Sequence, residues 1–273
     1  MRTLLASAVA CAAMALGGCA GTGVTFPNLQ MNDIKTAQGT VVVPEGKGPF
    51  PAVVIMHGCS GIRQNSHNWA RLLRENGYAS IIVDTFALRG VSEICTNLGR
   101  VQSYARVLDA YAALRYLGTR PDIASDRVGV MGFSNGAVAT LGAASDLWQD
   151  RVTDTPLRFR AAVALYPECL LFQSSTFPVP TAILIGDKDD WTLAASCEKL
   201  VANLPRNSHP VLLKVYPGAH HGFDDLTANM HMSNAMNRNS KTGRGASAYG
   251  DGPSLTKAEK DTLEFLKRHL APR

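Results

Sequence analysis

The stretch that decides the fold is residues 132–136, Gly-Phe-Ser-Asn-Gly. A short apolar run, residues 127–131, precedes it, and a run of small helix-forming residues, 137–144, follows it. A strand, a sharp turn at serine and a helix is the layout of a nucleophile elbow, in which the hydroxyl projects above the sheet. The flanking glycines leave room where the helix and a neighbouring strand press close. Because the motif is short, a plain strand-to-helix turn with Ser134 as N-cap is the alternative interpretation.

The rest of the chain alternates between strand-like and helix-like patterns. Continuously apolar short strands alternating with helices predict a mostly parallel sheet with helices on both faces, an α/β fold. We see no internal repeat and no second domain. The expected strands are 40–43, 52–56, 79–83, 127–131, 161–166, 182–185 and 211–216, and the clearest helices are 68–75, 101–117 and 255–270.

Composition excludes some classes of function. The chain has 273 residues, is 46% hydrophobic and carries a formal net charge of +5. This size and apolar content suit one sizeable globular domain. The basic residues form no run, so a solvated basic surface is favoured over nucleic-acid binding.

The N-terminus has the pattern of an export signal. Arg2 is followed by an apolar stretch, 4–16, and then by Gly-Gly-Cys at 17–19. This pattern predicts a signal peptide over 1–18, and it resembles the bacterial lipobox, in which Cys19 becomes the acylated first residue of the mature chain. Ala20 is not the aspartate that favours inner-membrane retention. We therefore expect an exported lipoprotein on the periplasmic side of the outer membrane, with plain secretion as the alternative. The remaining boundaries are 19–39 as tether and lead-in, and 40–273 as the single folded domain.

Export changes how the other cysteines are interpreted. Cys59, Cys95, Cys169 and Cys197 are an even number of thiols in an oxidising compartment. Three pairings are possible. Cys59–Cys95 and Cys169–Cys197 are favoured because each would join loops at one end of the sheet, whereas four buried free thiols are the alternative. No cysteine spacing resembles a zinc site, and we expect no metal.

A serine hydroxyl needs a base to become nucleophilic, and the base needs an orienting acid. In doubly wound hydrolases the chain order is serine, acid, histidine. The turn 186–192 follows an expected strand and contains three aspartates, of which Asp189 is the preferred acid and Asp190 the next. The turn 216–223 follows another strand, and His221 is preferred over His220 as the base.

Acyl transfer also needs N–H groups that stabilise the developing oxyanion. Residues 56–61, Met-His-Gly-Cys-Ser-Gly, end an expected central strand. The backbone N–H groups of Cys59 and Asn135 are the predicted pair of donors. His57 in the same turn is better interpreted as a residue that braces the loop than as a second base.

With the serine, acid and histidine turns in order, the chain resembles the dienelactone hydrolase family of α/β-hydrolases. The resemblance covers roughly 41–215, together with His221 and the C-terminal helix. It implies the α/β-hydrolase fold and a triad of Ser134, Asp189 and His221. The residues that carry it are 54–61, 83–86, 114–117, 132–136, 186–191 and 221–223.

Departures from the family pattern limit what the resemblance implies about the substrate. The type enzymes use cysteine where this chain has Ser134, and they carry a glutamate near the place of Gly58. Arg89 is the candidate match for one carboxylate-binding arginine, although bracing of the Cys95 loop is the favoured role. Asp225 stands where a further arginine would be expected. The resemblance therefore implies the fold and the triad for this chain, but it does not imply the dienelactone substrate.

We therefore predict a serine hydrolase that cleaves carboxylic esters, with lactones as a possible extension, and that needs no cofactor. A peptidase, a carbon–carbon bond hydrolase or an acyltransferase on the same triad is the alternative within enzymes. A catalytically inactive surface lipoprotein that binds a ligand is the alternative outside them. Trp191, the segment 86–100 and the long segment 227–252 are the expected determinants of specificity. The last segment is predicted to be a loop that either covers the site or is a mobile insertion.

Overall fold

The computed structural model describes residues 21–271. Its main sheet has eight strands in the order β1-β2-β4-β3-β5-β6-β7-β8. The strands β4, β3, β5, β6, β7 and β8 are parallel, and β1 and β2 are antiparallel additions at one edge. The bounds are β1 Thr22–Pro27, β2 Thr36–Val42, β3 Phe50–Met56, β4 Ala79–Asp84, β5 Ile123–Phe133, β6 Ala162–Leu165, β7 Thr181–Gly186 and β8 Val211–Tyr216.

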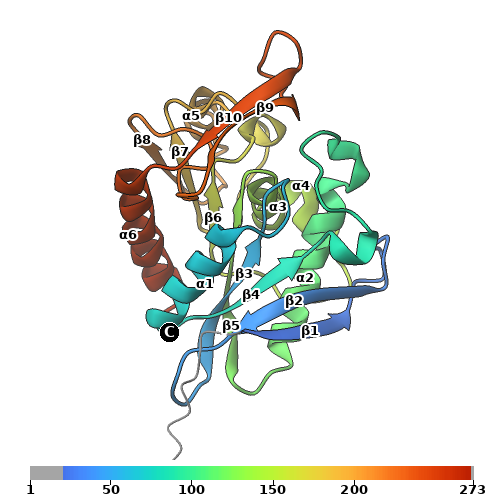
Figure 1. Cartoon of the computed structure of the whole chain (residues 1–273). Coiled ribbons are helices and arrows are strands. Elements are labelled where there is room, and N and C mark those ends of the chain that lie inside the picture. The colour runs from blue at the N-terminus through green and yellow to red at the C-terminus, as the bar shows by residue number, and fades with distance from the viewer. Residues whose placement is uncertain (1–20, 272–273) are drawn as a thin grey trace, which may run out of the picture.

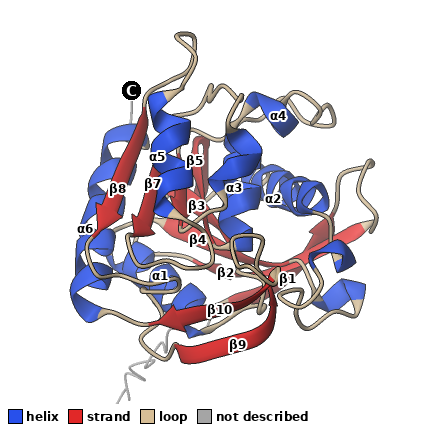
Figure 2. Cartoon of the chain, turned by 90° about the horizontal axis from the view of Figure 1, so that it is seen from above, coloured by secondary structure: helices blue, strands red, loops and turns tan. Residues whose placement is uncertain are grey.

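Helices cover both faces of the sheet, which confirms the predicted α/β class. Figure 2 shows α1 and α6 on one face and α2, α3 and α5 on the other. The middle strands β6 and β7 are therefore buried along their whole length, as expected for a parallel sheet with two covered faces. The helices are α1 Gln64–Glu75, α2 Ser103–Gly118, α3 Asn135–Ala144, α4 Asp146–Gln149, α5 Ala194–Ala202 and α6 Gly252–His269, with short 3₁₀ turns at Ala87–Arg89, Leu98–Arg100 and Cys169–Phe172.

The folded part of the chain begins earlier than the sequence indicated. The segment 19–39 was expected to be a tether and lead-in, yet β1 pairs with β2 along its length. Only Phe26 of β1 is buried, so the strand has too few apolar residues to show the alternating pattern of a half-buried strand. Main-chain pairing at the edge of the sheet, rather than side-chain burial, places this strand.

The segment 227–252 is ordered, and the expectation of a long loop is wrong. It contains an antiparallel hairpin of β9, Asn229–Met236, and β10, Arg244–Tyr249. The hairpin is a separate two-stranded sheet, drawn in orange-red at the top of Figure 1. Most of its residues are exposed or half-buried, which explains why its composition suggested a loop.

Arg89 connects the N-terminal segment to the body of the fold. Its guanidinium contacts the carboxylates of Asp33 at 2.6 Å and Asp109 at 2.7 Å. The side chains of Arg89 and Asp109 are 5% and 1% exposed. Asn28 and Asn32 each donate a further hydrogen bond of 2.8 Å to Asp109. Arg89 is therefore a structural residue that is held by partners within the protein.

Replacing Arg89 with alanine is expected to destabilise the fold. Removing one partner of a buried ion pair leaves the Asp109 carboxylate uncompensated, which typically costs about 3–5 kcal/mol. Urea denaturation followed by circular dichroism measures this loss. The control is Lys260→Ala, since the side chain of Lys260 is 74% exposed and its contact with Glu264 is 3.9 Å long. The effect of this control on stability should stay below about 1 kcal/mol. An unchanged stability of Arg89→Ala would contradict the structural role.

Candidate active site

Ser134 occupies a strained turn between β5 and α3. Its backbone has φ 52° and ψ −118°, a conformation that residues other than glycine rarely adopt. A Cβ placed on Gly132 would lie 2.5 Å from the carbonyl oxygen of Gly136, and a Cβ on Gly136 would collide with the carbonyl groups of Met56 and His57. Both glycines are therefore required by close backbone approach. This geometry is that of a nucleophile elbow.

The three predicted partners meet at the carboxyl ends of the parallel strands. The Nε2 atom of His221 lies 2.8 Å from Oγ of Ser134, and its Nδ1 lies 2.8 Å from Oδ2 of Asp189. Ser134 holds the N-cap position of α3, but its hydroxyl makes no capping hydrogen bond. Ser134 thus stands at the N-cap position, but its hydroxyl lies against the imidazole of His221 and does not cap the helix.

The structure distinguishes between the candidate acids. Asp189 is 4% exposed, and its Oδ1 accepts hydrogen bonds from the main-chain N–H groups of Trp191 and Thr192 at 2.9 and 2.8 Å. The hydroxyl of Thr192 donates to Oδ2 of the same carboxylate at 2.9 Å. The carboxylate of Asp190 instead accepts from the main-chain N–H of Ser247, at 3.0 Å in the hairpin. Asp189 is thus the carboxylate that faces the imidazole.

Aromatic rings fix the orientation of His221. Tyr166 packs edge-on at 4.6 Å between ring centroids, and Trp191 lies at 4.8 Å. The phenol of Tyr166 donates a hydrogen bond of 2.5 Å to Asp224, which also accepts 2.8 Å from the indole of Trp69. Burial raises the pKa of Asp224 above its ordinary value. The sequence analysis missed this hydrogen-bonded cluster of Tyr166, Asp224 and Trp69, because its members come from three distant parts of the chain.

His220 is directed elsewhere, since its ring packs edge-on against Tyr249 at 5.1 Å. Within the turn 216–223, the structure therefore brings only His221 to Ser134.

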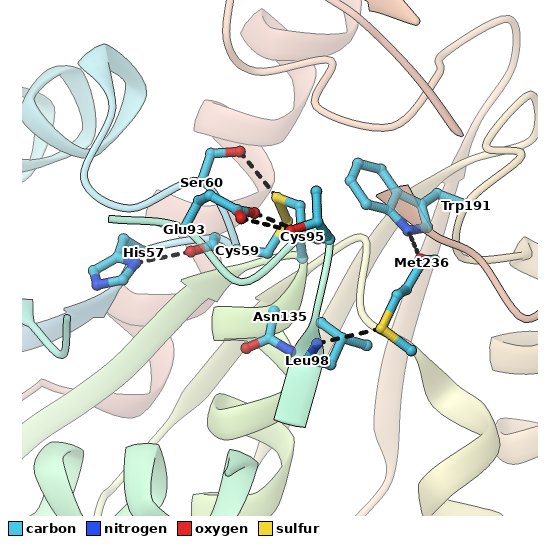
Figure 3. The surroundings of a disulfide bond; sticks show 12 residues. His57, Cys59, Ser60, Glu93, Cys95, Leu98, Asn135, Trp191 and Met236 are labelled. Atoms are coloured by element: carbon cyan, nitrogen blue, oxygen red, sulfur yellow. Dashed lines mark hydrogen bonds between the residues drawn. A yellow bond between two sulfur atoms is a disulfide. The ribbon is translucent and has the colours of Figure 1, made fainter. Parts of the chain in front are cut away.

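The predicted oxyanion donors lie beside the nucleophile. Within the described residues, no protein acceptor pairs with the main-chain N–H of Cys59 or of Asn135, and both residues line the cavity at Ser134. Figure 3 shows Cys59 joined to Cys95, with Asn135 nearby. The second disulfide joins Cys169 to Cys197. The structure thus contains the two pairs that the sequence favoured, and disulfides of this kind are typical of exported proteins.

His57 braces the loop that carries Cys59. Its ring is fully buried, with Nδ1 2.8 Å from the carbonyl oxygen of Gly58. The main-chain N–H of Thr85 donates to Nε2 at 3.2 Å, which requires the proton to be on Nδ1. Burial lowers the pKa of His57 to about 3, so the ring stays neutral. The interpretation of this ring as a second base has no geometric support, because the main-chain groups of Gly58 and Thr85 occupy its two nitrogens.

These observations agree with a comparison against protein families. The model of the dienelactone hydrolase family matches residues 37–269. The chain belongs to the dienelactone hydrolase family. The match also includes the β9–β10 hairpin, which the resemblance in sequence did not cover, and it ends at the last residue of α6. Membership of this family makes the protein a hydrolase of the carboxylic ester type.

Individual members and neighbours show how far the likeness reaches. A Bradyrhizobium protein described as a probable 2-oxo-3-(5-oxofuran-2-ylidene)propanoate lactonase is 26% identical over 202 residues, 67% of this chain and 77% of its own length. Esterase 2 of Thermogutta terrifontis has a TM-score of 0.67 at 15% identity, covering 93% of this chain and 97% of its own. A dienelactone hydrolase from Anabaena variabilis has a TM-score of 0.60 at 18% identity, covering 92% and 99%. The two structures establish the shared fold.

A cavity of about 550 Å³ opens at Ser134 within this dienelactone hydrolase fold. Its walls come from the turn after β3, residues of the segment 98–103, the start of α3, the segment 168–171, the acid turn and the hairpin. Trp191 lines it and donates an indole hydrogen bond of 2.8 Å to the main-chain oxygen of Met236 (Figure 3). Arg89 does not line it, so the alternative in which Arg89 attracts an acidic substrate has no geometric support. Among the described residues, no cluster of three or more histidine, cysteine or carboxylate side chains is arranged to hold a metal ion.

Arg106 of α2 is a further residue that the sequence analysis missed. Its guanidinium is fully buried and donates hydrogen bonds to the carbonyl oxygen of His57 and to the side-chain oxygen of Asn135. It therefore connects the two loops that carry the predicted oxyanion donors. Burial lowers its pKa to about 9. The sequence pattern of α2 did not indicate the role of Arg106, because a single arginine among apolar residues is usually interpreted as a solvent-exposed side chain.

Replacing Arg106 with methionine is expected to lower kcat about 10- to 100-fold with little change in KM. Small displacements of catalytic groups have effects of this size, and the turns that carry the predicted oxyanion donors would lose their shared hydrogen-bond donor. Steady-state kinetics on a chromogenic ester measures the effects on kcat and on KM separately. The conservative variant Arg106→Lys should recover part of kcat, because it restores one donor. A merely structural role predicts lower thermal stability with unchanged kcat in the folded enzyme, and that result would contradict the prediction.

Proposed function

We propose that this protein is a serine hydrolase of carboxylic esters that acts through Ser134, His221 and Asp189. The observation that carries the proposal is the continuous hydrogen-bonded chain from the Ser134 hydroxyl through the imidazole to a buried carboxylate. The strained conformation of the Ser134 turn is further support, because a purely structural turn does not require it.

The geometry supports a two-step reaction. Nε2 of His221 removes the hydroxyl proton as Oγ of Ser134 attacks the ester carbonyl, and the protonated imidazole then gives that proton to the leaving alcohol. The buried carboxylate of Asp189 holds Nδ1–H and stabilises the positive charge that forms on the ring. Main-chain N–H groups of Cys59 and Asn135 stabilise the oxyanion. Water, deprotonated by His221, releases the acid and restores Ser134.

The probable lactonase among the relatives makes lactones a natural extension of the substrate range, since a lactone is a cyclic ester. The same triad would serve a peptidase, a carbon–carbon bond hydrolase or an acyltransferase. No residue in the described site specifically favours these three, so ester hydrolysis stands as the proposal. An inactive binding protein would have no need of the aligned imidazole.

Ser134→Ala is expected to abolish ester hydrolysis and labelling by a fluorophosphonate probe. Loss of a triad serine costs about 10⁶-fold in kcat in a well-characterised serine hydrolase. Asp189→Asn should retain probe binding at a much slower rate, with kcat reduced about 10⁴-fold because the imidazole takes the wrong tautomer. The measurements are p-nitrophenyl acetate hydrolysis and mass spectrometry of the labelled protein. Asp190→Asn is the matched control and should keep substantial activity. Wild-type rates in Ser134→Ala would refute the proposal.

We also infer that the protein is exported and anchored by lipid on Cys19. Residues 1–18 and Cys19 lie outside the described residues, so the inference rests on the sequence pattern and on the two disulfides. No helix in the described part of the chain is long and apolar enough to cross a membrane. A lipid chain would contribute about 0.8 kcal/mol of membrane affinity per buried methylene.

Cys19→Ser is expected to move the protein from the membrane fraction to the soluble periplasmic or secreted fraction of bacterial cells. Cell fractionation with immunoblotting and metabolic labelling by a palmitate analogue measure this change. The control is Ser7→Ala, which leaves the cysteine intact and should remain in the membrane fraction. Identical fractionation of the wild type and Cys19→Ser would contradict the lipid anchor.

A further inference from the structure

Two cavities of unequal size meet at Ser134. The larger measures about 550 Å³ and the smaller about 80 Å³. Cys59, Ser134 and Trp191 line both of them. The nucleophile and the indole of Trp191 therefore lie at the boundary, and a bound ester must extend in both directions from Ser134.

The catalytic groups are divided unequally between the cavities. His221 lines the smaller cavity and is absent from the walls of the larger one. Asn135, whose N–H is one proposed oxyanion donor, lines only the larger cavity. The base and one donor for the oxyanion therefore act from different sides of the attacked carbon.

This division gives the ester an orientation. The carbon of the tetrahedral intermediate carries Oγ of Ser134, the oxyanion, the acyl chain and the leaving oxygen. The leaving oxygen must come within hydrogen-bond distance of Nε2 of His221 to receive its proton. The alcohol part of the ester then occupies the smaller cavity, and the acyl chain occupies the larger one.

The walls of the cavities indicate which groups fit. The smaller cavity has about one seventh of the volume of the larger one, so it leaves less room for a substituent of the ester. The larger cavity is in the range of typical small-ligand sites, about 300–1,000 Å³. Its apolar wall consists of Leu98, Val138, Leu171, Trp191 and Met236. Charged residues of both signs, Glu168 and Arg238, also line it, which favours no net charge on the acyl chain.

We propose that the enzyme is selective for esters of short alcohols, such as methyl and ethyl esters, with apolar acyl chains of medium length. The inference rests on the proposed function of Ser134, His221 and Asp189. In the reaction, the bond between the acyl carbon and the alkoxy oxygen breaks, and the acyl–Oγ bond forms. The serine proton leaves with the short alcohol. Water then adds to the acyl carbon, and the medium-chain acid is released.

Two isomeric esters test the orientation directly. Methyl hexanoate and pentyl acetate have the same atoms but place the long chain on opposite sides of the carbonyl. The purified enzyme is expected to hydrolyse methyl hexanoate with kcat/KM at least about tenfold higher, since a few methylenes in an apolar pocket discriminate by this much. Equal rates, or faster hydrolysis of pentyl acetate, would overturn the proposal.

Cavity variants test whether the walls cause the preference. Leu98→Trp narrows the larger cavity and is expected to lower the ratio of kcat/KM for methyl hexanoate to that for methyl acetate about fivefold or more. The matched control is Leu212→Trp, because Leu212 is a 37%-exposed leucine in β8 that lines neither cavity. It should keep the wild-type ratio. An unchanged ratio in a folded Leu98→Trp protein would count against the assignment.

The smaller cavity is tested in the opposite direction. Met232→Ala removes a side chain from its wall and is expected to raise kcat/KM for pentyl acetate relative to methyl hexanoate. A ratio shifted the other way would contradict the assignment. Fluorophosphonate labelling separates the two levels of failure: a protein that labels at Ser134 but prefers pentyl acetate overturns only the orientation. A protein that neither labels nor hydrolyses any ester overturns the proposed function as well.

Discussion

The backbone of Ser134 is the constraint on which the active site depends. A non-glycine residue with positive φ costs about 1–3 kcal/mol and persists only where the surroundings hold it. Here the surroundings are specific: the Ser134 N–H donates to the carbonyl oxygen of Leu165 at 3.0 Å, and its carbonyl accepts from Val138 at 3.1 Å. Gly136 lets α3 approach the end of β3 closely. The same packing that strains the turn brings its hydroxyl to His221 and places its neighbour Asn135 in the same cavity wall as Cys59.

The parallel sheet explains how residues from distant parts of the sequence come together in the site. The strands β3, β5, β7 and β8 all end at one edge, and they are followed by the turns that carry Cys59, Ser134, Asp189 and His221. In open α/β sheets this edge is where ligands bind. Arg106 adds a side-chain connection between the ends of two neighbouring strands, since it bonds to the turns after β3 and β5 together. Its burial, with a pKa lowered to about 9, shows that the fold tolerates an expensive group at this position.

The sequence predicted the parts of the site that are encoded locally. The elbow, the aspartate turn and the histidine turn each follow a strand within a few residues, so motif and position appear together. Arg106 and Arg89 could not be assigned in the same way. Both are arginines in or near helical segments, and only the distant partners His57 and Asp109 separate a positioning role from a structural one. The β9–β10 hairpin was missed because its pairing depends on main-chain hydrogen bonds, and its polar side chains resemble those of a loop.

Hydrogen bonds join the hairpin to the turn that carries Asp189. The indole of Trp191 donates to the main-chain oxygen of Met236, and Asp190 accepts from the N–H of Ser247. Asp190 and Trp191 directly follow Asp189 in the chain. The carboxylate of Asp189 itself accepts a hydrogen bond from the main-chain N–H of Trp191. A displacement of the hairpin by an oversized substrate would therefore pull on the turn that positions the acid. The wall of the larger cavity and the turn that holds Asp189 are thus joined by hydrogen bonds.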